Sequence, residues 1–483
     1  MSQIKTSKMT NWRWVMCAML FFATTVNYMD RQVLSLTWKD FISPEFHWTD
    51  EIYGYITAAF SIFYAVANLF AGKFVDWMGT KKGYLWAIVI WSVGAVLHAL
   101  CGLFTQGWMG GDYNSTAALV GATGDAAVVI ATVSMYAFLF CRCILALGEA
   151  GNFPAAIKVT AEYFPKKDRA FATSIFNSGA SVGALAAPAT IPLLAKAFGW
   201  EMAFVIIGVL GFIWAGLWVF MYDKPAKSKF VNEAELLYVN QDDAEMAQHV
   251  VEEAEEKQMS YMQAFSYRQT WSFIFGKFMT DGVWWFFLFW APAYFSDQYG
   301  YTSDSAMGIA LIFTLYAIVT VLSMFGGYLP KLFVEKKGMN PYQGRMLAML
   351  IFAFFPILAL FAQPMGQYSA WWPCIIIGFV GAGHQAWSAN IFSTTGDMFP
   401  KSAVATITGI GSMAGGLGSF LINMGSGKLF TYAEQQGAAF QFMGFEGKPA
   451  GYMIIFCICA VAYLIGWSVM KLLVPKYKPI VLD

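Results

Sequence analysis

Long apolar stretches recur along this chain and constrain its fold more than any other feature. A helix that spans a membrane needs about 20 predominantly apolar residues, and twelve such stretches can be counted. They begin near Trp14, Tyr53, Tyr84, Ala127, Ala170, Met202, Trp271, Ala306, Met346, Trp371, Val404 and Gly451. Hydrophobic residues make up 58% of the 483 residues and charged residues only 12%, which excludes a soluble globular domain. The sequence therefore predicts an all-α membrane protein with twelve transmembrane helices.

A polar interval divides the twelve stretches into two groups of six. It runs from Tyr222 to Gln269, between the sixth stretch and the seventh. Its acidic residues include Glu233, Glu235, Asp242, Asp243, Glu252, Glu253, Glu255 and Glu256. This pattern indicates a solvated helical linker. We therefore predict an N-terminal six-helix bundle at 1–222, a cytoplasmic linker at 223–269 and a C-terminal six-helix bundle at 270–483.

Lysines and arginines are distributed unevenly between the two sides of the predicted bundles. Most of the 30 lie near the termini, in the linker or in the loops that follow even-numbered stretches. The opposite loops hold only Lys39, Lys196, Lys428 and Lys448. Because positive residues in short loops are retained in the cytoplasm, we expect both termini to be cytoplasmic. The formal net charge of zero does not indicate a nucleic-acid partner.

The two halves of the chain repeat each other in sequence. Phe164-Pro165-Lys166 after the fourth stretch is matched, 235 residues later, by Phe399-Pro400-Lys401 after the tenth. The same offset places Gly383-His384 opposite Gly148-Glu149. Internal repeats of this kind are typical of transporters whose substrate site lies between two related bundles. The repeat therefore predicts two pseudo-symmetric bundles with a site between them.

Charged residues occur inside the apolar stretches, where lipid would penalise them. Asp30 and Arg31 lie in the first stretch, and Arg142 and Glu149 lie in the fourth. Ionisable groups at such depth mark a polar path through the membrane. Arg31 is the first candidate for binding an anion, because a guanidinium keeps its proton in a low-dielectric site. Snorkelling toward the outer interface or a structural ion pair are the alternatives for Arg31.

Glu149 and Asp30 are candidates for carrying a proton. Arg142 and Glu149 are seven residues apart, so they share a helix face at a separation of about 10 Å and cannot pair along that helix. Glu149 therefore needs either a proton or a cation from another helix, and a permanent ion pair is the alternative. Asp30 and Arg31 diverge by about 100° around their helix. A second protonation site at Asp30 fits this arrangement, while Arg142 is either a ligand or a tie between helices.

The seventh stretch carries a charged pair of its own. Lys277 and Asp281 are four residues apart, so their charges can cancel on one helix face. Alternatively, the long Lys277 side chain could reach cytoplasmic water. We leave the pair outside the predicted site.

The remaining reactive residues give no indication of an enzyme. The seven cysteines lie in or beside apolar stretches, which suggests neither a zinc site nor a disulfide framework. The four histidines are scattered along the chain. We therefore expect no metal, no cofactor and no catalytic residues. A sensor would need an output domain, for which the polar linker is too short.

Several motifs resemble those of a known family. The segment from Gly72 to Lys82 resembles the loop signature of the major facilitator superfamily. Tyr28-Met29-Asp30-Arg31, the run from Arg142 to Pro154 and Glu162-Tyr163-Phe164-Pro165 are similar to the anion:cation symporter family within it. That family carries organic anions together with protons or sodium. The resemblance runs from about Trp14 to Leu473.

Further motifs look most like those of bacterial hexuronate transporters. They are Gly79-Thr80-Lys81-Lys82-Gly83-Tyr84, Trp200-Glu201-Met202-Ala203-Phe204 and Gly383-His384-Gln385-Ala386. The resemblance implies the twelve-helix fold of the superfamily and import of a sugar-acid anion, such as glucuronate or galacturonate, by proton symport through alternating access. It also implies a multi-pass, usually monomeric protein of the bacterial inner membrane, whose partners are an organic anion and a proton or sodium ion.

Two departures leave the exact substrate open. Asp30, together with Trp387-Ser388 in the tenth stretch, is more similar to the galactonate-transporting branch of the family. That branch has a glutamine where this chain has Ala180. An aldonate of the galactonate type is therefore an alternative to a hexuronate. Sodium-coupled symport and organophosphate exchange are further alternatives.

A sugar acid needs aromatic platforms together with amide and hydroxyl groups. Candidates for substrate binding beside Arg31 and Arg142 are Tyr28, Tyr64, Asn152, Asn177 and Ser181 in the first half and His384, Trp387, Ser388 and Ser412 in the second. The resemblance assigns substrate contact to Tyr28, Tyr64 and Trp387. For each aromatic residue the alternative role is packing inside the protein or a place in the aromatic belt at the membrane interface. For His384 the alternative is an ordinary packing role with a hydrogen bond.

The loop after the second stretch has a different predicted role. The residues concerned are Gly72, Asp76, Gly79, Lys81 and Lys82. Asp76 lies near the helix end, and the basic residues beyond it can face the ends of neighbouring helices. Such contacts could latch one conformation. We therefore predict gating rather than substrate recognition for this loop.

Overall fold

The computed structural model describes residues 8–241, 259–323 and 325–480. Its first half forms six spanning segments. The elements of this half are α1 (Trp12–Thr37), the π-helical turn η1 (Trp38–Ile42), α2 (Ser43–Phe46), α3 (Asp50–Met78), α4 (Thr80–His98), α5 (Cys101–Met109), α6 (Thr116–Val120), α7 (Asp125–Glu149), α8 (Asn152–Tyr163), α9 (Lys166–Phe198) and α10 (Trp200–Met221). α4 and α5 together form one bent segment, and α7 and α8 form another that is interrupted near Gly151.

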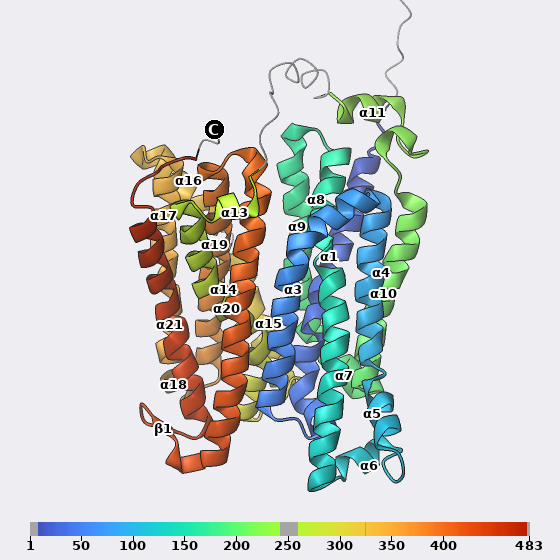
Figure 1. Cartoon of the computed structure of the whole chain (residues 1–483), viewed down its shortest axis with the longest axis vertical. Helices are drawn as coiled ribbons and strands as arrows, with labels where there is room; N and C mark the ends of the chain where they lie inside the picture. Colours follow the sequence, from blue (N-terminus) through green and yellow to red (C-terminus); the bar gives the residue numbers. More distant parts are fainter. Residues whose placement is uncertain (1–7, 242–258, 324, 481–483) are drawn as a thin grey trace, which may run out of the picture.

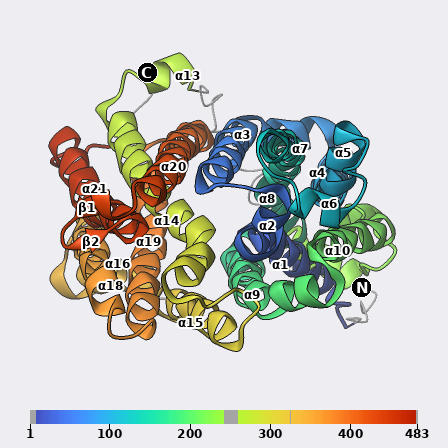
Figure 2. The same ribbon diagram turned by 90° about the horizontal axis from the view of Figure 1, so that it is seen from below.

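The second half repeats this plan. Between the halves lie the short elements η2 (Pro225–Lys227), α11 (Glu233–Val239) and α13 (Tyr261–Ala264). The second half then contains α14 (Arg268–Tyr299), α15 (Ala306–Ser323), α16 (Phe325–Lys337), α17 (Pro341–Ala353), η3 (Phe355–Leu358), α18 (Ala359–Gly366), α19 (Trp371–Met398), α20 (Lys401–Gln436), η4 (Gly437–Ala439), β1 (Gln441–Phe442), β2 (Phe445–Glu446) and α21 (Lys448–Leu473). The two strands form a small antiparallel hairpin. Figures 1 and 2 show the two bundles side by side.

The twelve predicted spans are confirmed, since each coincides with a helical segment that begins within five residues of the predicted start. Among the described residues, eight helices are long and apolar enough to cross a membrane, or nine if the bent α4–α5 pair counts as one span. α1, α14 and α19 are not among them, and these three carry Arg31, Lys277 and His384. Each of these three helices thus brings an ionisable group into the bundle, and so does the strongly apolar α7, which carries Arg142 and Glu149.

The sequence repeat is visible in how two long helices begin. Pro165 and Pro400 occupy the N-cap positions of α9 and α20 in extended conformations. Proline cannot donate a backbone hydrogen bond, and this position requires none. α9 and α20 then run for 33 and 36 residues in equivalent places of the two halves.

The halves meet most extensively where α20 packs against α3. A Cβ atom added at Gly54 would lie 2.8 Å from the backbone oxygen of Asn423, and one at Gly427 would lie 2.6 Å from that of Asp50. Only glycine allows the two backbones to approach so closely. Ser61 and Ser419 share a hydrogen bond of 2.8 Å further along the same contact.

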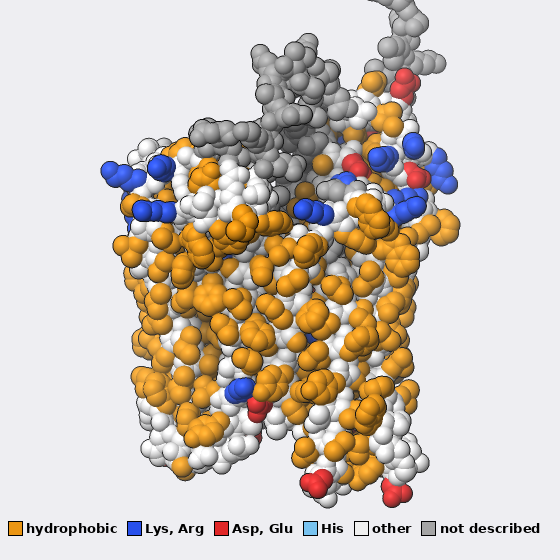
Figure 3. All heavy atoms as spheres, in the orientation of Figure 1, with side chains coloured by type: hydrophobic (Ala, Val, Ile, Leu, Met, Phe, Trp, Pro, Cys, Tyr) orange, Lys and Arg blue, Asp and Glu red, His pale blue; other side chains and the backbone are white. Residues whose placement is uncertain are grey.

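The two ends of the molecule carry different elements. The termini face carries the start of α1, α11 and the end of α21, and the far face carries η1, the end of α14 and the β1–β2 hairpin (Figure 1). In the view of Figure 3, hydrophobic side chains cover the middle of the molecule, and lysines and arginines gather toward the termini face. This distribution agrees with the charge asymmetry of the sequence.

The prediction of a solvated linker is correct for Glu233 and wrong for Glu235. Glu233 is exposed, whereas Glu235 is fully buried against the start of α1. Its carboxylate accepts hydrogen bonds from the backbone N–H groups of Trp12 (2.9 Å) and Arg13 (3.0 Å), so it satisfies donors that the helix itself leaves free. The other predicted linker acids, Asp242, Asp243, Glu252, Glu253, Glu255 and Glu256, lie outside the described residues.

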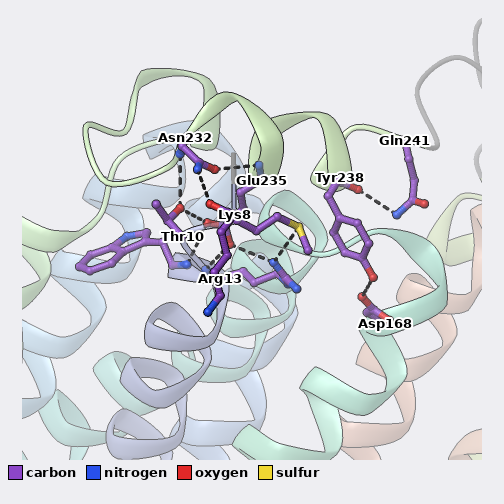
Figure 4. A network of polar contacts seen from close by, with 10 residues as sticks. Lys8, Thr10, Arg13, Asp168, Asn232, Glu235, Tyr238 and Gln241 are labelled. Carbon is purple, nitrogen blue, oxygen red and sulfur yellow. Dashed lines mark hydrogen bonds and ion pairs between the residues drawn. The ribbon is translucent and has the colours of Figure 1, made fainter. Parts of the chain in front are cut away.

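Further contacts fasten α11 to the first half (Figure 4). The Arg13 guanidinium donates to Glu235 at 3.1 Å and lies over the ring of Tyr238, whose hydroxyl donates to Asp168 at 2.7 Å. Burial raises the pKa of the Glu235 carboxyl, but the hydrogen bonds from Thr10, Arg13 and Trp12 outweigh it and lower that pKa below its usual value. The sequence missed this role because an acidic residue in a polar segment has no pattern that reveals a distant helix end.

Candidate functional site

Arg31 and Glu149 form a buried ion pair between two helices of the first half. The Arg31 guanidinium, on α1, donates to one Glu149 oxygen, at the end of α7, through Nη2 at 2.8 Å and Nε at 3.0 Å. Arg31 is 6% exposed and Glu149 1% exposed. The second oxygen of Glu149 is buried without a hydrogen-bond partner among the described residues. The sequence left open whether a proton or a cation from another helix neutralises Glu149, and in the conformation seen here that cation is Arg31.

Aromatic rings from both halves surround the Arg31 guanidinium. Its central carbon lies 4.7 Å from the ring centroid of Tyr64 on α3, and 5.2 Å from those of Tyr28 on α1 and Trp285 on α14. Rings at these distances attract a cation through their negative faces. Tyr28 and Tyr64 were predicted for this site, and the structure brings both to Arg31. Because Trp285 belongs to the second half, the guanidinium lies where the two bundles meet.

The sequence reasoning missed Trp285. It lies within Trp284-Trp285-Phe286-Phe287, a run in which no residue is distinguished by its type. The one available signal was its position four residues after Asp281, which places both on the same face of α14.

Arg142 lies next to this pair without joining it. It is 1% exposed, donates to the backbone oxygen of Arg31 at 3.4 Å, and lies over the ring of Phe60 at 4.6 Å. Its Nε and Nη1 have no hydrogen-bond partner in the described part of the chain. The contact with α1 supports the role of a tie between helices, and the two free nitrogens leave donors for a ligand. Both roles predicted for Arg142 thus have a structural basis.

Asp30 is the most unusual group of the site. It is fully buried, and neither of its carboxyl oxygens has a hydrogen-bond partner among the described residues. A buried carboxylate without a partner costs several kcal/mol, and a proton removes most of this cost. The geometry therefore leaves both Asp30 oxygens free to accept a hydrogen bond.

The predicted amide and hydroxyl groups are less closely associated with Arg31. Asn177 is exposed, and Ser181, Ser388 and Ser412 are partly exposed. Within the described residues, no hydrogen bond joins these four to the Arg31–Glu149 pair. Asn152 is buried and accepts a hydrogen bond of 2.8 Å from the Tyr84 hydroxyl, so it ties α8 to α4. The structure therefore brings together the charged and aromatic parts of the predicted site, but not its amide and hydroxyl parts.

Lys277 and His384, the ionisable residues considered in the second half, each have a partner in that half. Lys277 pairs with Asp281 at 2.7 Å, as predicted from their spacing, and lies over the Phe392 ring at 4.1 Å. His384 shares a hydrogen bond of 2.6 Å with the Tyr463 hydroxyl and stacks on Trp284. These contacts favour the packing alternative for His384.

Trp387 has a buried polar atom without a hydrogen-bond partner among the described residues. It is fully buried and packs edge-on against Tyr463, with ring centroids 5.4 Å apart. Its indole N–H has no hydrogen-bond partner among the described residues. A ligand hydroxyl or a water could satisfy this donor.

The loop predicted for gating contacts its own half in this conformation. Gly79 has a φ of 78°, which favours glycine at the turn between α3 and α4. Lys81 pairs with Asp223 after α10 at 2.8 Å, and Lys82 is exposed. Gly72 has no atom near the place of a Cβ, and the Asp76 side chain lies outside the described set.

Known proteins are similar to this chain over most of its length. The sequence model of the Major Facilitator Superfamily matches residues 20–422. A hexuronate transporter of Escherichia coli (strain K12) is 29% identical over 472 residues, which cover 96% of this chain and 95% of the relative. A galacturonate transporter of Dickeya chrysanthemi is 28% identical, with 74% of this chain and 94% of the relative covered. A probable galactarate/D-glucarate transporter of Escherichia coli (strain K12) is 24% identical and covers 92% of this chain and 94% of the relative.

Solved structures agree on the fold. A D-xylose-proton symporter has a TM-score of 0.67 at 15% identity, with 97% of this chain and 98% of that chain covered. A bacterial homolog of the human lysosomal transporter Spinster also has a TM-score of 0.67, at 18% identity, with 97% of each chain covered. At these identities the likeness concerns the fold alone.

Proposed function

The chain belongs to the Major Facilitator Superfamily, and from this premise we propose that it is a secondary active transporter that imports a sugar-acid anion by proton symport. A hexuronate such as glucuronate or galacturonate is the proposed substrate. The observation that carries the proposal is the buried Arg31 guanidinium, which is held by Glu149 and lies among aromatic rings from both halves. A site formed by both bundles can be exposed to either side as the bundles rock.

Proton coupling follows from the way Arg31 is neutralised. While Glu149 is ionised, it occupies the guanidinium that an anion would need. A proton on Glu149 removes this competition and leaves Arg31 with an uncompensated charge, so the affinity for an anion rises. By linkage, a bound anion raises the affinity of Glu149 for a proton to the same extent. One proton carried with one monovalent sugar acid is electroneutral.

Asp30 provides a second proton-accepting group beside this pair. It lies next to Arg31 in sequence and is buried without a hydrogen-bond partner among the described residues. We propose that Asp30 carries its proton when the site is closed and exchanges it when water reaches the site. Arg142 supplies further donors through its free nitrogens.

The choice of a sugar acid rests on the relatives and on the chemistry of the site. Relatives at 28–29% identity are named hexuronate and galacturonate transporters. Tyr28, Tyr64 and Trp285 offer ring faces to the apolar side of a sugar, and the free indole N–H of Trp387 offers a donor. Asn177, His384, Ser388 and Ser412 remain proposed contacts of lesser weight.

The topology in the membrane is part of the proposal. We propose that the termini face is cytoplasmic in a bacterial inner membrane, because lysines and arginines gather there (Figure 3). The proposed divisions are the N-terminal bundle at 1–222, the linker at 223–269 and the C-terminal bundle at 270–483. The end of α10 at Met221 and the start of α14 at Arg268 support these bounds. The protein is proposed to act as a monomer.

Uptake into proteoliposomes tests the function. Radiolabelled glucuronate and galacturonate would be supplied with and without a pH gradient, and galactonate, glucarate and glycerol phosphate would be added as competitors. We expect uptake that requires the proton gradient and is lost in Arg31→Ala. Uptake driven by sodium instead would overturn proton coupling, and competition by glycerol phosphate alone would replace the symporter with an organophosphate exchanger.

A further inference from the structure

A cavity of about 520 Å³ lies at the far face of the second half, and we call it the far-face cavity. Its wall is formed by the end of α14 and the residues just beyond it, by the start of α15 and by the turn that joins α18 to α19. None of the wall residues belongs to the group around Arg31. Small-molecule sites in proteins have volumes of about 300–1,000 Å³, so the cavity has the size of a ligand site.

The end of α14 supplies two tyrosine rings to this wall. Gly300 follows the helix with a φ of 69°, a conformation that glycine adopts readily. The chain turns there, so that the backbone N–H of Tyr301 donates to the backbone oxygen of Phe295 at 3.3 Å. The rings of Tyr299 and Tyr301 then stack, with centroids 6.3 Å apart and an angle of 17° between their planes. The local fold thus places two neighbouring aromatic rings in the cavity wall.

A chain of hydrogen bonds holds this side of the wall in place. Gln363 of α18 donates through Nε2 to Oε1 of Gln298 at 2.6 Å, and its own Oε1 accepts from the Tyr294 hydroxyl at 2.8 Å. The Tyr294 hydroxyl in turn lies 3.4 Å from that of Tyr299. The wall is therefore ordered before any ligand arrives, and a preorganised site loses less conformational entropy on binding.

Several polar groups of the wall have no hydrogen-bond partner among the described residues. They are Nε2 of Gln298, the hydroxyls of Tyr301 and Tyr368, and the side-chain amide of Gln367. Amide and hydroxyl groups both donate and accept, so together they can hold a ligand with many hydroxyls. The indole of Trp371, which is 38% exposed, adds an apolar ring face to the same wall.

Among the described residues that line the cavity, none carries a charged side chain. Asp297, which is next to Gln298 in sequence, is already paired with Lys39 and Lys448. An anion that entered the cavity would lose its hydration without gaining a cation, in contrast to an anion at Arg31. The cavity is therefore suited to an uncharged ligand.

We infer that the far-face cavity is a binding site for an uncharged saccharide. Its aromatic rings contact the apolar face of a sugar ring, and its amide and hydroxyl groups bind the sugar hydroxyls. A belt at the membrane interface also collects tyrosine and tryptophan, but a belt does not require a cavity or unpaired amide groups. In the proposed topology the far face is the outer one, so the site meets saccharides outside the inner membrane. It is separate from the proposed sugar-acid site at Arg31.

The measurement is saturation-transfer difference NMR on the full chain in nanodiscs of phosphatidylethanolamine and phosphatidylglycerol. The probes are methyl α-glucoside and maltose. The protein is purified in a detergent without a sugar headgroup, because such a headgroup would compete with the probes. We expect signals from both probes that empty nanodiscs do not give. The signals should persist with excess glucuronate and in Arg31→Ala with Glu149→Gln, since they arise at a different site.

Two exposed aromatic residues of the wall provide the variants. Trp371→Ala and Tyr368→Ala, at side chains that are 38% and 86% exposed, should leave the fold intact. Each is expected to weaken maltose binding about tenfold, because truncating an aromatic contact in a binding site has effects of this order. Trp372→Ala is the matched control, since Trp372 is the next residue and is 44% exposed but does not line the cavity. It should bind maltose as the wild type does.

An uncharged sugar can reach the cavity from solution or as the headgroup of a glycolipid. Native mass spectrometry of nanodiscs that contain glucosyl diacylglycerol, with diacylglycerol as the control lipid, tests the second source. Selective retention of the glucosyl lipid that is lost in Trp371→Ala would support the same site with a membrane ligand.

The inference is overturned if neither the soluble probes nor the glucosyl lipid bind to the wild type. It is also overturned if Trp371→Ala and Tyr368→Ala both bind as Trp372→Ala does. Since these measurements involve no transport, absence of sugar-acid uptake would refute the proposed function and leave the saccharide result standing.

Discussion

The two halves share one fold but treat their buried charges differently. In the first half, Arg31 reaches from α1 to Glu149 on α7, and the Asp30 carboxyl has no hydrogen-bond partner in the described chain. In the second half, Lys277 and Asp281 pair across one turn of α14, and His384 is bound to Tyr463. The two halves therefore share the arrangement of their helices but not the pairing of their buried charged residues.

The difference indicates which half changes its charge state. An ion pair between two helices can be opened by a proton or an anion, and it can form again when the ligand leaves. A pair on one helix turn keeps its partner within reach in every conformation, so it offers little to a ligand. We infer that the first half carries the coupling chemistry and that the second half mainly supplies the opposing wall. Four substitutions test this division.

The largest effect is expected for Arg31→Ala. An anion that loses its charged partner in a buried site loses about 100-fold or more in affinity. Binding measured by isothermal titration and uptake into proteoliposomes should both fall by this factor. Because the single variant also leaves Glu149 unpaired, Arg31→Ala with Glu149→Gln serves as the control, with stability recovered and binding still absent. Substrate binding by that double variant at wild-type affinity would remove Arg31 from the site.

Glu149→Gln should uncouple transport from protons. The amide cannot release or accept the coupling proton, so a gradient of one pH unit, which can sustain about tenfold accumulation in an electroneutral symport, should sustain none. Exchange of internal for external substrate should persist, because it needs no net proton movement. Asp30→Asn is the companion variant, and accumulation that survives in Glu149→Gln but not in Asp30→Asn would transfer the coupling role to Asp30.

Lys277→Met should affect stability more than transport. It leaves Asp281 buried without its partner, at a cost of about 3–5 kcal/mol, whereas Lys277→Met with Asp281→Leu should lose much less because the charge is gone too. Thermal unfolding followed by tryptophan fluorescence gives both values. The double variant should retain uptake within about threefold of wild type if the pair has no role in binding. Complete loss of uptake in a stable double variant would show that the charged pair of the second half also takes part in transport.

The smallest effect is expected for His384→Gln. Loss of the hydrogen bond to Tyr463 should reduce the free energy of unfolding by about 1–2 kcal/mol and change uptake less than about threefold. The relevant measurement is the pH profile of uptake, which should keep the wild-type shape. A profile that shifts in His384→Gln would show that the second half takes part in proton transfer.

Much of the fold followed from local patterns in the sequence. The twelve apolar stretches, the Phe-Pro-Lys motifs before α9 and α20 and the spacing of Lys277 and Asp281 each predicted a feature of the structure. Arg31 and Glu149 could be recognised as unusual from their surroundings alone. What the sequence did not indicate was that they are partners, or that Trp285 covers them from the other half. Glu235 was misjudged for the same reason, since its partner is a helix end 222 residues away.

By itself, the sequence determined how many segments cross the membrane, where they begin and which of them carry charged residues. The reason is that a stretch of about 20 apolar residues in a membrane can satisfy its backbone hydrogen bonds by forming a helix and in few other ways. Tertiary structure decided which buried charges meet. Arg31 and Glu149 are 118 residues apart, and the mutual ion pairs of Lys39, Asp50, Asp297 and Lys448 join four separate elements. The sequence shows that a charged residue lies in a membrane-spanning helix. Which neighbouring residue it faces depends on the rotation of that helix, and this rotation is set by the packing of the whole bundle.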